Sequence, residues 1–198
     1  MKSGIGSHTR GGRGATNDWI TPPHILEALG EFDLDPCECV RQPWPCARRA
    51  YTVVDDGLKQ PWTGRVFCNP PYGNEAWPFL ERMAQHGDGI SLIFARTETN
   101  LFQRYVWHEA SAILFLAGRL HFHYPDGTKA QGNSGGPSIL IAYGESNAGA
   151  LRECGLPGSL VTGWALQNME TIDAATGAQV DEWPPVVGRK TSENSKEE

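Results

Sequence analysis

Residues 66–73 read Val-Phe-Cys-Asn-Pro-Pro-Tyr-Gly, so a short apolar run passes directly into two consecutive prolines. The run at residues 66–68 has the composition of the end of a buried strand. Each prolyl ring fixes its own φ at about −65°, and it also pushes the residue before it into the extended region. Residues 69–72 are therefore predicted to form a stiff segment at a strand end, which we call the ledge.

The ledge presents two neighbouring hydrogen-bond acceptors, the side-chain oxygen of Asn69 and the carbonyl oxygen of Pro70. Two acceptors that face one NH₂ group draw its lone pair out of conjugation, and Tyr72 offers a flat face for stacking a base. Asn69, Pro70, Pro71 and Tyr72 include no nucleophile and no strong acid, which favours direct transfer of a group to an amine. An ordinary strand-to-loop turn is the alternative, because Pro-Pro commonly ends strands and Asn-Pro marks turns.

Helix and strand patterns alternate on both sides of the ledge. Thr21 is a plausible N-cap, Pro22 suits a first helical turn, and the apolar stripe that follows ends at Gly30. Further helices are predicted at residues 75–86 and 100–109. Strands are predicted at residues 32–35, 66–68, 90–95, 112–117 and 138–143. This alternation predicts an α/β fold with a mostly parallel sheet flanked by helices.

In a parallel α/β sheet, ligands bind outside the carboxyl ends of the strands. Asp35, which Pro36 follows, and Asn69 both fall at that edge, so we expect one shared site. Asp56, in the sequence Asp55-Asp56-Gly57, is a second acidic candidate. Such carboxylates usually accept hydrogen bonds from the ribose hydroxyls or adenine amine of a nucleotide-like ligand. The alternative is that they are turn residues, because Asp-Pro and Asp-Gly are common turn dipeptides.

Residues 118–137 form a long, polar, glycine-rich segment between two predicted strands. Loops of this length inside a domain are usually functional or disordered. The segment carries a mixture of cations and aromatic rings that suits phosphates and bases, namely Arg119, His121, His123, Tyr124 and Lys129. A β-hairpin excursion with a solvated tip is the equally weighted alternative.

Composition limits the class of protein. With 198 residues, 39% of them hydrophobic, the chain suits one domain of ordinary size. We predict a flexible N-terminal arm at residues 1–16, one domain at 17–179 and a polar tail at 180–198. A net charge of −6 argues against DNA binding by broad electrostatics but leaves room for a local basic groove. No long apolar stretch or signal sequence stands out, so the expected location is the cytoplasm.

The five cysteines are an odd number, and nothing marks the chain as secreted, so free thiols are expected. Cys37, Cys39 and Cys46 cluster in sequence, but their spacing is not one that zinc sites use. We therefore predict no metal site.

Taken together, the motifs resemble a known family. They occur in order between about residues 17 and 145 and comprise Asp18–Pro23, Leu34–Pro36, Asp55–Leu58, Trp62, Val66–Tyr72, Gly118–Phe122 and Asn133–Tyr143. This order is similar to that of the phage-type, Dam-like DNA N6-adenine methyltransferases. The resemblance implies a Rossmann-like class I methyltransferase fold, S-adenosylmethionine as cofactor, and double-stranded DNA as partner. It also implies a cytoplasmic location in a bacterial or phage-infected cell.

The resemblance also implies roles for individual residues. The ledge residues Asn69, Pro70, Pro71 and Tyr72 would hold the target base. The cofactor would lie against Asp35 and Pro36, with its adenine at Asp56 and its methionine end along Trp19, Thr21 and Pro22. One departure concerns the cofactor. Many methyltransferases of this fold have a glycine-rich turn after the first strand, whereas Asp35 is followed here by Pro-Cys-Glu-Cys. The phage-type group also tends to lack that turn, and Glu38 is a candidate for binding the ribose.

Alternatives remain open on sequence grounds. An N4-cytosine DNA methyltransferase makes the same chemical demand on the ledge, and a protein-glutamine N5-methyltransferase uses the same tetrapeptide on an amide. The missing glycine-rich turn counts against the latter. A catalytically inactive DNA-binding relative is the non-enzyme alternative. A cytosine C5 enzyme is set aside, because neither Pro36-Cys37 nor Pro45-Cys46 follows a suitable apolar strand. The sequence predicts neither the recognition site nor the oligomeric state.

Overall fold

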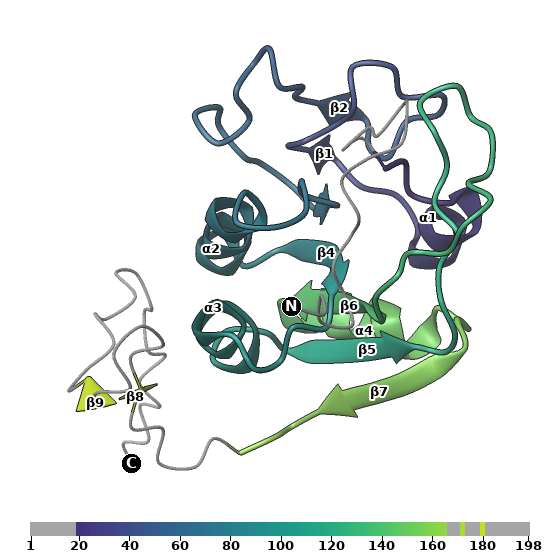
Figure 1. Cartoon of the computed structure of the whole chain (residues 1–198). Coiled ribbons are helices and arrows are strands. Elements are labelled where there is room, and N and C mark those ends of the chain that lie inside the picture. Colours follow the sequence, from purple (N-terminus) through teal and green to yellow (C-terminus); the bar gives the residue numbers. More distant parts are fainter. Residues whose placement is uncertain (1–18, 166–170, 173–178, 181–198) are drawn as a thin grey trace, which may run out of the picture. The chain divides into compact units, whose positions relative to one another are not determined.

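The computed structural model describes residues 19–165, 171–172 and 179–180 of the chain (Figure 1). The described residues up to Ala165 belong to one compact unit, and the remaining four belong to a second. In the second unit, β8 (Thr171–Ile172) pairs antiparallel with β9 (Gln179–Val180). The predicted arm at 1–16 and nearly all of the predicted tail lie outside the described residues. The predicted domain limits of 17 and 179 remain predictions.

The first unit contains one mixed sheet and its covering helices. In chain order its elements are α1 (Pro23–Leu29), β1 (Leu34–Asp35), β2 (Arg49–Ala50), β3 (Val66–Cys68), α2 (Ala76–His86), β4 (Gly89–Phe94), α3 (Asn100–Phe102), the π-helical turn η1 (Gln103–Trp107), β5 (Ala112–Leu116), β6 (Ser138–Tyr143), α4 (Glu145–Glu153) and β7 (Gly158–Thr162).

The seven strands lie in the order β2-β1-β3-β4-β6-β5-β7. The pairings from β2 through β4 are parallel, and those from β4 to β7 are antiparallel. The predicted mostly parallel sheet is thus confirmed for one half and wrong for the other. The reason is the segment at 118–137, which returns the chain from β5 to β6 without a helix. Parallel neighbours need a long crossover, whereas antiparallel neighbours need only a loop.

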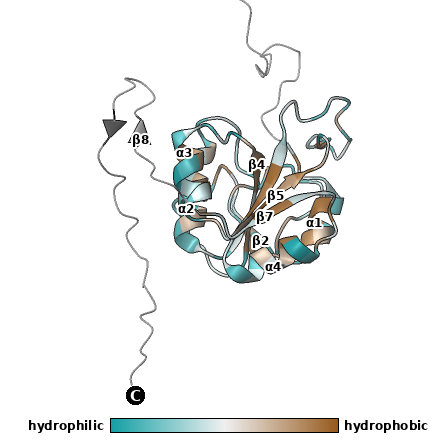
Figure 2. Ribbon diagram, turned by 90° about the horizontal axis from the view of Figure 1, so that it is seen from below, coloured by the Kyte–Doolittle hydropathy of each residue, from teal (hydrophilic) through white to brown (hydrophobic). Residues whose placement is uncertain are grey.

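Helices cover both faces of the sheet (Figures 1 and 2). On one face, Ile25 and Leu29 of α1 and Leu151 of α4 pack with Phe67 of β3. On the other face, α2, α3 and η1 pack against Val66 and Cys68, the neighbours of Phe67 in the same strand. Successive residues of a strand point to opposite faces, so a strand covered on both sides is apolar throughout. This explains the unbroken apolar runs of β3 and β6, whose residues are all buried.

Most elements predicted from apolar periodicity are confirmed with small shifts of their ends. The strand at 138–143 has the predicted limits, and the predicted strand at 32–35 is shortened to Leu34–Asp35. The sequence analysis missed β2, α4 and β7, which are short or carry mixed residues. Thr21 is not the N-cap of α1, because the N-cap is Pro22 and no side chain caps the helix. Thr21 is instead buried and bonded elsewhere, as described below.

No helix in the described part of the chain is long and apolar enough to cross a membrane.

Candidate functional site

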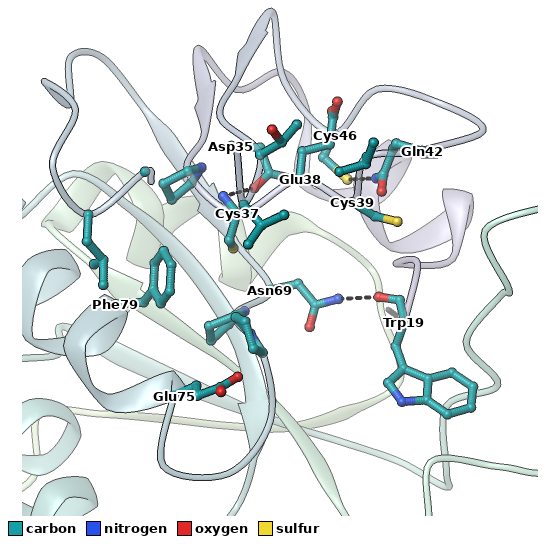
Figure 3. A pocket seen from close by; sticks show the side chains of 18 of the residues that line it. Trp19, Asp35, Cys37, Glu38, Cys39, Gln42, Cys46, Asn69, Glu75 and Phe79 are labelled. Atoms are coloured by element: carbon teal, nitrogen blue, oxygen red, sulfur yellow. Dashed lines mark hydrogen bonds between the residues drawn. The ribbon is translucent and has the colours of Figure 1, made fainter. Parts of the chain in front are cut away.

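The carboxyl ends of β1 and β3 lie side by side, because the two strands pair in parallel with Leu34 opposite Val66. Asp35 ends β1, and Asn69 directly follows β3. Both residues line one cavity of about 650 Å³, which we call the site cavity (Figure 3). The structure thus brings the two predicted strand-end residues to a shared site.

The predicted site residues divide between two cavities. The site cavity is lined by Trp19, Thr21, Asp35, Pro36, Asp56, Asn69, Pro70, Pro71 and Tyr72. A second cavity of about 580 Å³, the basic cavity, is lined by Pro22, Arg119, His121, His123 and Lys129. Pro22 is therefore separated from the cofactor residues with which the sequence analysis grouped it. Tyr124 lines neither cavity, but its ring contacts that of Trp19 at a centroid distance of 5.8 Å.

The Asn69 amide is anchored through its NH₂ group. Its nitrogen donates to the backbone carbonyl of Trp19 at 2.9 Å and to the hydroxyl of Thr21 at 3.2 Å. Figure 3 shows the nitrogen turned toward Trp19 and the oxygen turned away from it. Within the described residues that oxygen is buried and has no hydrogen-bond partner. A buried acceptor without a partner costs about 1–3 kcal/mol, so a ligand that brings a donor here relieves that cost.

Tyr72 is packed more tightly than the sequence suggested. Its ring stacks on Phe94 at a centroid distance of 4.4 Å and an interplanar angle of 23°. The Phe122 ring makes a T-shaped contact with the same ring, at a centroid distance of 6.0 Å. Burial raises the pKa of the Tyr72 hydroxyl, which stays a neutral phenol. The sequence analysis expected Tyr72 to offer a flat face for stacking a base and missed Phe94, which covers one face of the ring.

Asp35 is a buried carboxyl group that lines the site cavity. It accepts a hydrogen bond from the backbone N–H of Cys37 at 3.0 Å. The side chain is nevertheless only 3% exposed, and burial raises its pKa from 3.8 to about 7. Glu38, which also lines the cavity, adds a like charge that raises the pKa of Asp35 further. Near neutral pH the carboxyl group can therefore either donate or accept a hydrogen bond.

The raised pKa of Asp35 should make the free energy of unfolding depend on pH. Between pH 3.8 and about 7 the folded protein holds the Asp35 proton while the unfolded chain has lost it. The contribution of Asp35 to the free energy of unfolding therefore falls as the pH rises through this window, by on the order of 4 kcal/mol in total. We expect Asp35→Asn, which cannot ionise, to gain stability relative to the native protein as the pH rises from 4.5 to 8.5. Urea unfolding at a series of pH values measures that difference, and a constant difference would contradict the shifted pKa.

Asp56 lies on the loop after β2 and has a φ of +54°, the one positive φ outside glycine in the described residues. Its carboxylate pairs with Lys59 at 2.7 Å.

The next residue, Gly57, lies against the Asp35–Pro36 end of β1. A Cβ atom at position 57 would lie 1.8 Å from the Pro36 carbonyl oxygen. Only glycine allows this approach. The sequence analysis considered Asp56 as a ligand-binding residue, with a turn as the alternative, and did not detect this contact of Gly57.

The cysteines are all free thiols. Cys37, Cys39 and Cys46 line the site cavity, and the sulfur of Cys37 lies 3.7 Å from that of Cys68. Burial raises the pKa of Cys46, which accepts a hydrogen bond from the Gln42 amide at 2.9 Å. No group of three or more potential metal ligands occurs in the ranges that the structure describes.

A short β-bridge connects the segment at residues 19–22 with the segment at 118–137, and these two segments contribute residues to the site cavity and the basic cavity. Ile20 and His123 exchange backbone hydrogen bonds of 3.0 Å, and His123 also bridges to Lys129. The segment at 118–137 is therefore partly a β-hairpin, as the alternative interpretation expected, and it still directs cations into a cavity. Burial and the nearby Lys129 and His24 lower the pKa of His123. The backbone of Trp19 accepts a hydrogen bond from Asn69, and the backbone of Ile20 bonds to that of His123. The same short segment therefore contacts residues of both cavities.

A comparison with models of protein families assigns the chain to a family. Residues 7–151 match the family model described as DNA N-6-adenine-methyltransferase (Dam). No curated protein and no solved structure matches the chain. The family match covers well over half of the 198 residues and includes the described residues of both cavities apart from Leu156 and Pro157. The resemblance noted in the sequence is confirmed, and the chain belongs to the Dam family of DNA N-6-adenine-methyltransferases.

Proposed function

We propose that the protein transfers a methyl group from S-adenosylmethionine to the N6 amine of adenine in double-stranded DNA. The observation that carries this proposal is the anchored Asn69 amide, whose nitrogen is bonded to the protein and whose oxygen has no partner among the described residues. An amine is the group that this acceptor suits, because it donates hydrogen bonds. The family assignment supports adenine in DNA as the source of that amine.

The site cavity fits the cofactor in size and in chemistry. Its volume of about 650 Å³ lies in the range of small-molecule sites, roughly 300–1,000 Å³. Asp35 and Asp56 supply acceptors for ribose hydroxyls or an adenine amine, and Val40 and Phe79 supply apolar walls. When bound, S-adenosylmethionine supplies a methyl group on a positively charged sulfur. We also infer a Rossmann-like class I fold, supported by the parallel half of the sheet and by a site at the carboxyl ends of its strands.

The ledge would lower the barrier by positioning and by matched charge. The Asn69 oxygen and the Pro70 carbonyl accept hydrogen bonds from the target amine and stabilise the positive charge that develops on its nitrogen. The Asn69 oxygen is buried in this structure, so the atoms that cover it have to move before the target amine can reach it. A base flipped out of the duplex would stack on Tyr72, whose ring is itself held by its stack on Phe94.

The direct test of this function is transfer of labelled methyl from S-adenosylmethionine to unmethylated duplex DNA. We expect label in DNA and none in a protein or RNA substrate. Label in protein alone would contradict the proposal.

The Asp56 carboxylate is predicted to bind the cofactor. Replacement by asparagine keeps the tolerance for positive φ but removes the charge, so the variant should fold and bind S-adenosylmethionine about tenfold more weakly. Calorimetric titration measures the affinity. Lys59→Ala is the matched control, because it removes the ion-pair partner and leaves the Asp56 carboxylate in place. Equal affinities of the native protein and Asp56→Asn would exclude this role.

The basic cavity is proposed to bind the DNA backbone through Arg119 and Lys129, with His121 and His123 in the same lining. Tyr124, which contacts Trp19, is proposed to contact the DNA outside this cavity. A lost phosphate contact weakens binding to all sequences and reduces the slope of log affinity against log salt by about one. We expect this result for Arg119→Ala in fluorescence titrations with duplex DNA at several salt concentrations. Arg152→Ala, an exposed cation of α4 that lines neither cavity, should leave the slope unchanged. A slope that Arg119→Ala does not alter would place the DNA elsewhere.

A further inference from the structure

Thr21 makes a contact that neither the sequence nor the family match assigns. It is 1% exposed, it precedes the N-cap of α1, and its hydroxyl oxygen lies 3.2 Å from the side-chain nitrogen of Asn69. The other acceptor for that nitrogen is the Trp19 carbonyl, at 2.9 Å. The two acceptors come from one segment that lies about fifty residues from the ledge in sequence.

These two contacts use both hydrogens of the Asn69 NH₂ group. The two ends of an asparagine amide have nearly the same shape, so hydrogen bonds decide which end faces which way. A backbone carbonyl only accepts, and the reversed amide would set the Asn69 oxygen against the Trp19 carbonyl. The second contact, to Thr21, fixes the rotation of the amide plane, because one hydrogen bond alone leaves the group free to turn about it.

We propose that Thr21 is a positioning residue for methyl transfer. It holds the Asn69 amide so that the oxygen, rather than the NH₂ group, is left without a protein partner and can accept from the target amine. This inference rests on the proposed function. In this orientation the Asn69 side chain and the Pro70 carbonyl offer acceptors only, so they select bases with an exocyclic amine over bases with a carbonyl at the same place. The role differs from the contact with the methionine end of the cofactor that the resemblance implied for Thr21.

Thr21→Val tests the proposal, because valine has the shape of threonine and lacks the hydroxyl. We expect kcat for DNA methylation to fall by about tenfold, the effect of one lost hydrogen bond, with an unchanged dissociation constant for S-adenosylmethionine. Thr21→Ser keeps the hydroxyl and should restore kcat to within about twofold of the native value. An unchanged kcat in Thr21→Val would overturn the proposal. A loss that appears only in cofactor affinity would also overturn it and would favour the cofactor role.

A second measurement does not depend on activity. In ¹⁵N-labelled protein, the Asn69 side-chain NH₂ signals, assigned through their absence in Asn69→Ala, should exchange with solvent faster in Thr21→Val than in Thr21→Ser. Equal exchange in the two variants would contradict the proposal that the Thr21 hydroxyl holds the Asn69 NH₂ group. If the native protein methylates no DNA, the proposed function fails while this measurement still decides the role of Thr21. If Thr21→Val does not fold, Thr21→Ala takes its place in both measurements.

Discussion

Asn69→Ala should abolish methyl transfer to DNA while leaving cofactor binding nearly intact. Removal of one preorganised hydrogen-bonding group in an active site typically costs about 10²–10³ in rate. The loss here should reach or exceed that range, because the substitution removes the acceptor and also frees the Trp19 carbonyl and the Thr21 hydroxyl that hold it. Single-turnover transfer of labelled methyl measures the rate, and calorimetry measures the affinity for S-adenosylmethionine.

Asn74→Ala is the matched control for this experiment. Asn74 follows the ledge by two residues, is exposed, and does not line the site cavity. It should methylate DNA at the native rate. Native turnover by Asn69→Ala would refute the role of the ledge. Loss of cofactor affinity in the same variant would instead assign Asn69 to the cofactor.

Gly57→Ala should have the largest effect on stability and on cofactor binding. Its Cβ atom would lie 1.8 Å from the backbone oxygen of Pro36, a contact that only a backbone shift can relieve. Overpacking of this kind costs about 1–3 kcal/mol or more. The shift would also separate the loop that carries Asp56 from the strand end that carries Asp35. We therefore expect a lower free energy of unfolding in urea and a weaker affinity for S-adenosylmethionine.

Gly149→Ala is the control for this substitution. Gly149 lies within α4, and a Cβ atom there would meet no other atom within 4 Å. Because alanine favours the helix over glycine by about 0.5–1 kcal/mol, this variant should be slightly more stable than the native protein. If Gly57→Ala and the native protein unfold at the same urea concentration, the close approach of Gly57 to Pro36 does not contribute to the stability of the site.

The elements that sequence predicted best are those whose apolar residues are continuous or evenly spaced. The run at 138–143 is buried along its whole length, and both its ends are marked by polar or glycine residues. The amphipathic spacing at 75–86 likewise predicted α2 within one residue of its limits. The ledge and Asp35 could be placed together because carboxyl ends of parallel strands share an edge.

The features that sequence did not predict depend on contacts between distant residues. The stacking of Tyr72 on Phe94 requires knowing that β3 and β4 are neighbours. The Thr21 side chain fits the usual pattern of an N-cap, yet its hydrogen bond goes to Asn69 because the ledge lies beside it in the fold. The antiparallel half of the sheet likewise follows from how a loop, rather than a helix, connects β5 to β6. Local propensity carries none of this information.

The measurement that tests the central claim most directly is identification of the methylated nucleoside. Unmethylated duplex DNA is incubated with S-adenosylmethionine and either the native protein or Asn69→Ala, then digested and analysed by mass spectrometry. The proposal predicts N6-methyladenine from the native protein and none above background from the variant. N4-methylcytosine in place of N6-methyladenine, or equal amounts of N6-methyladenine from both proteins, would contradict it.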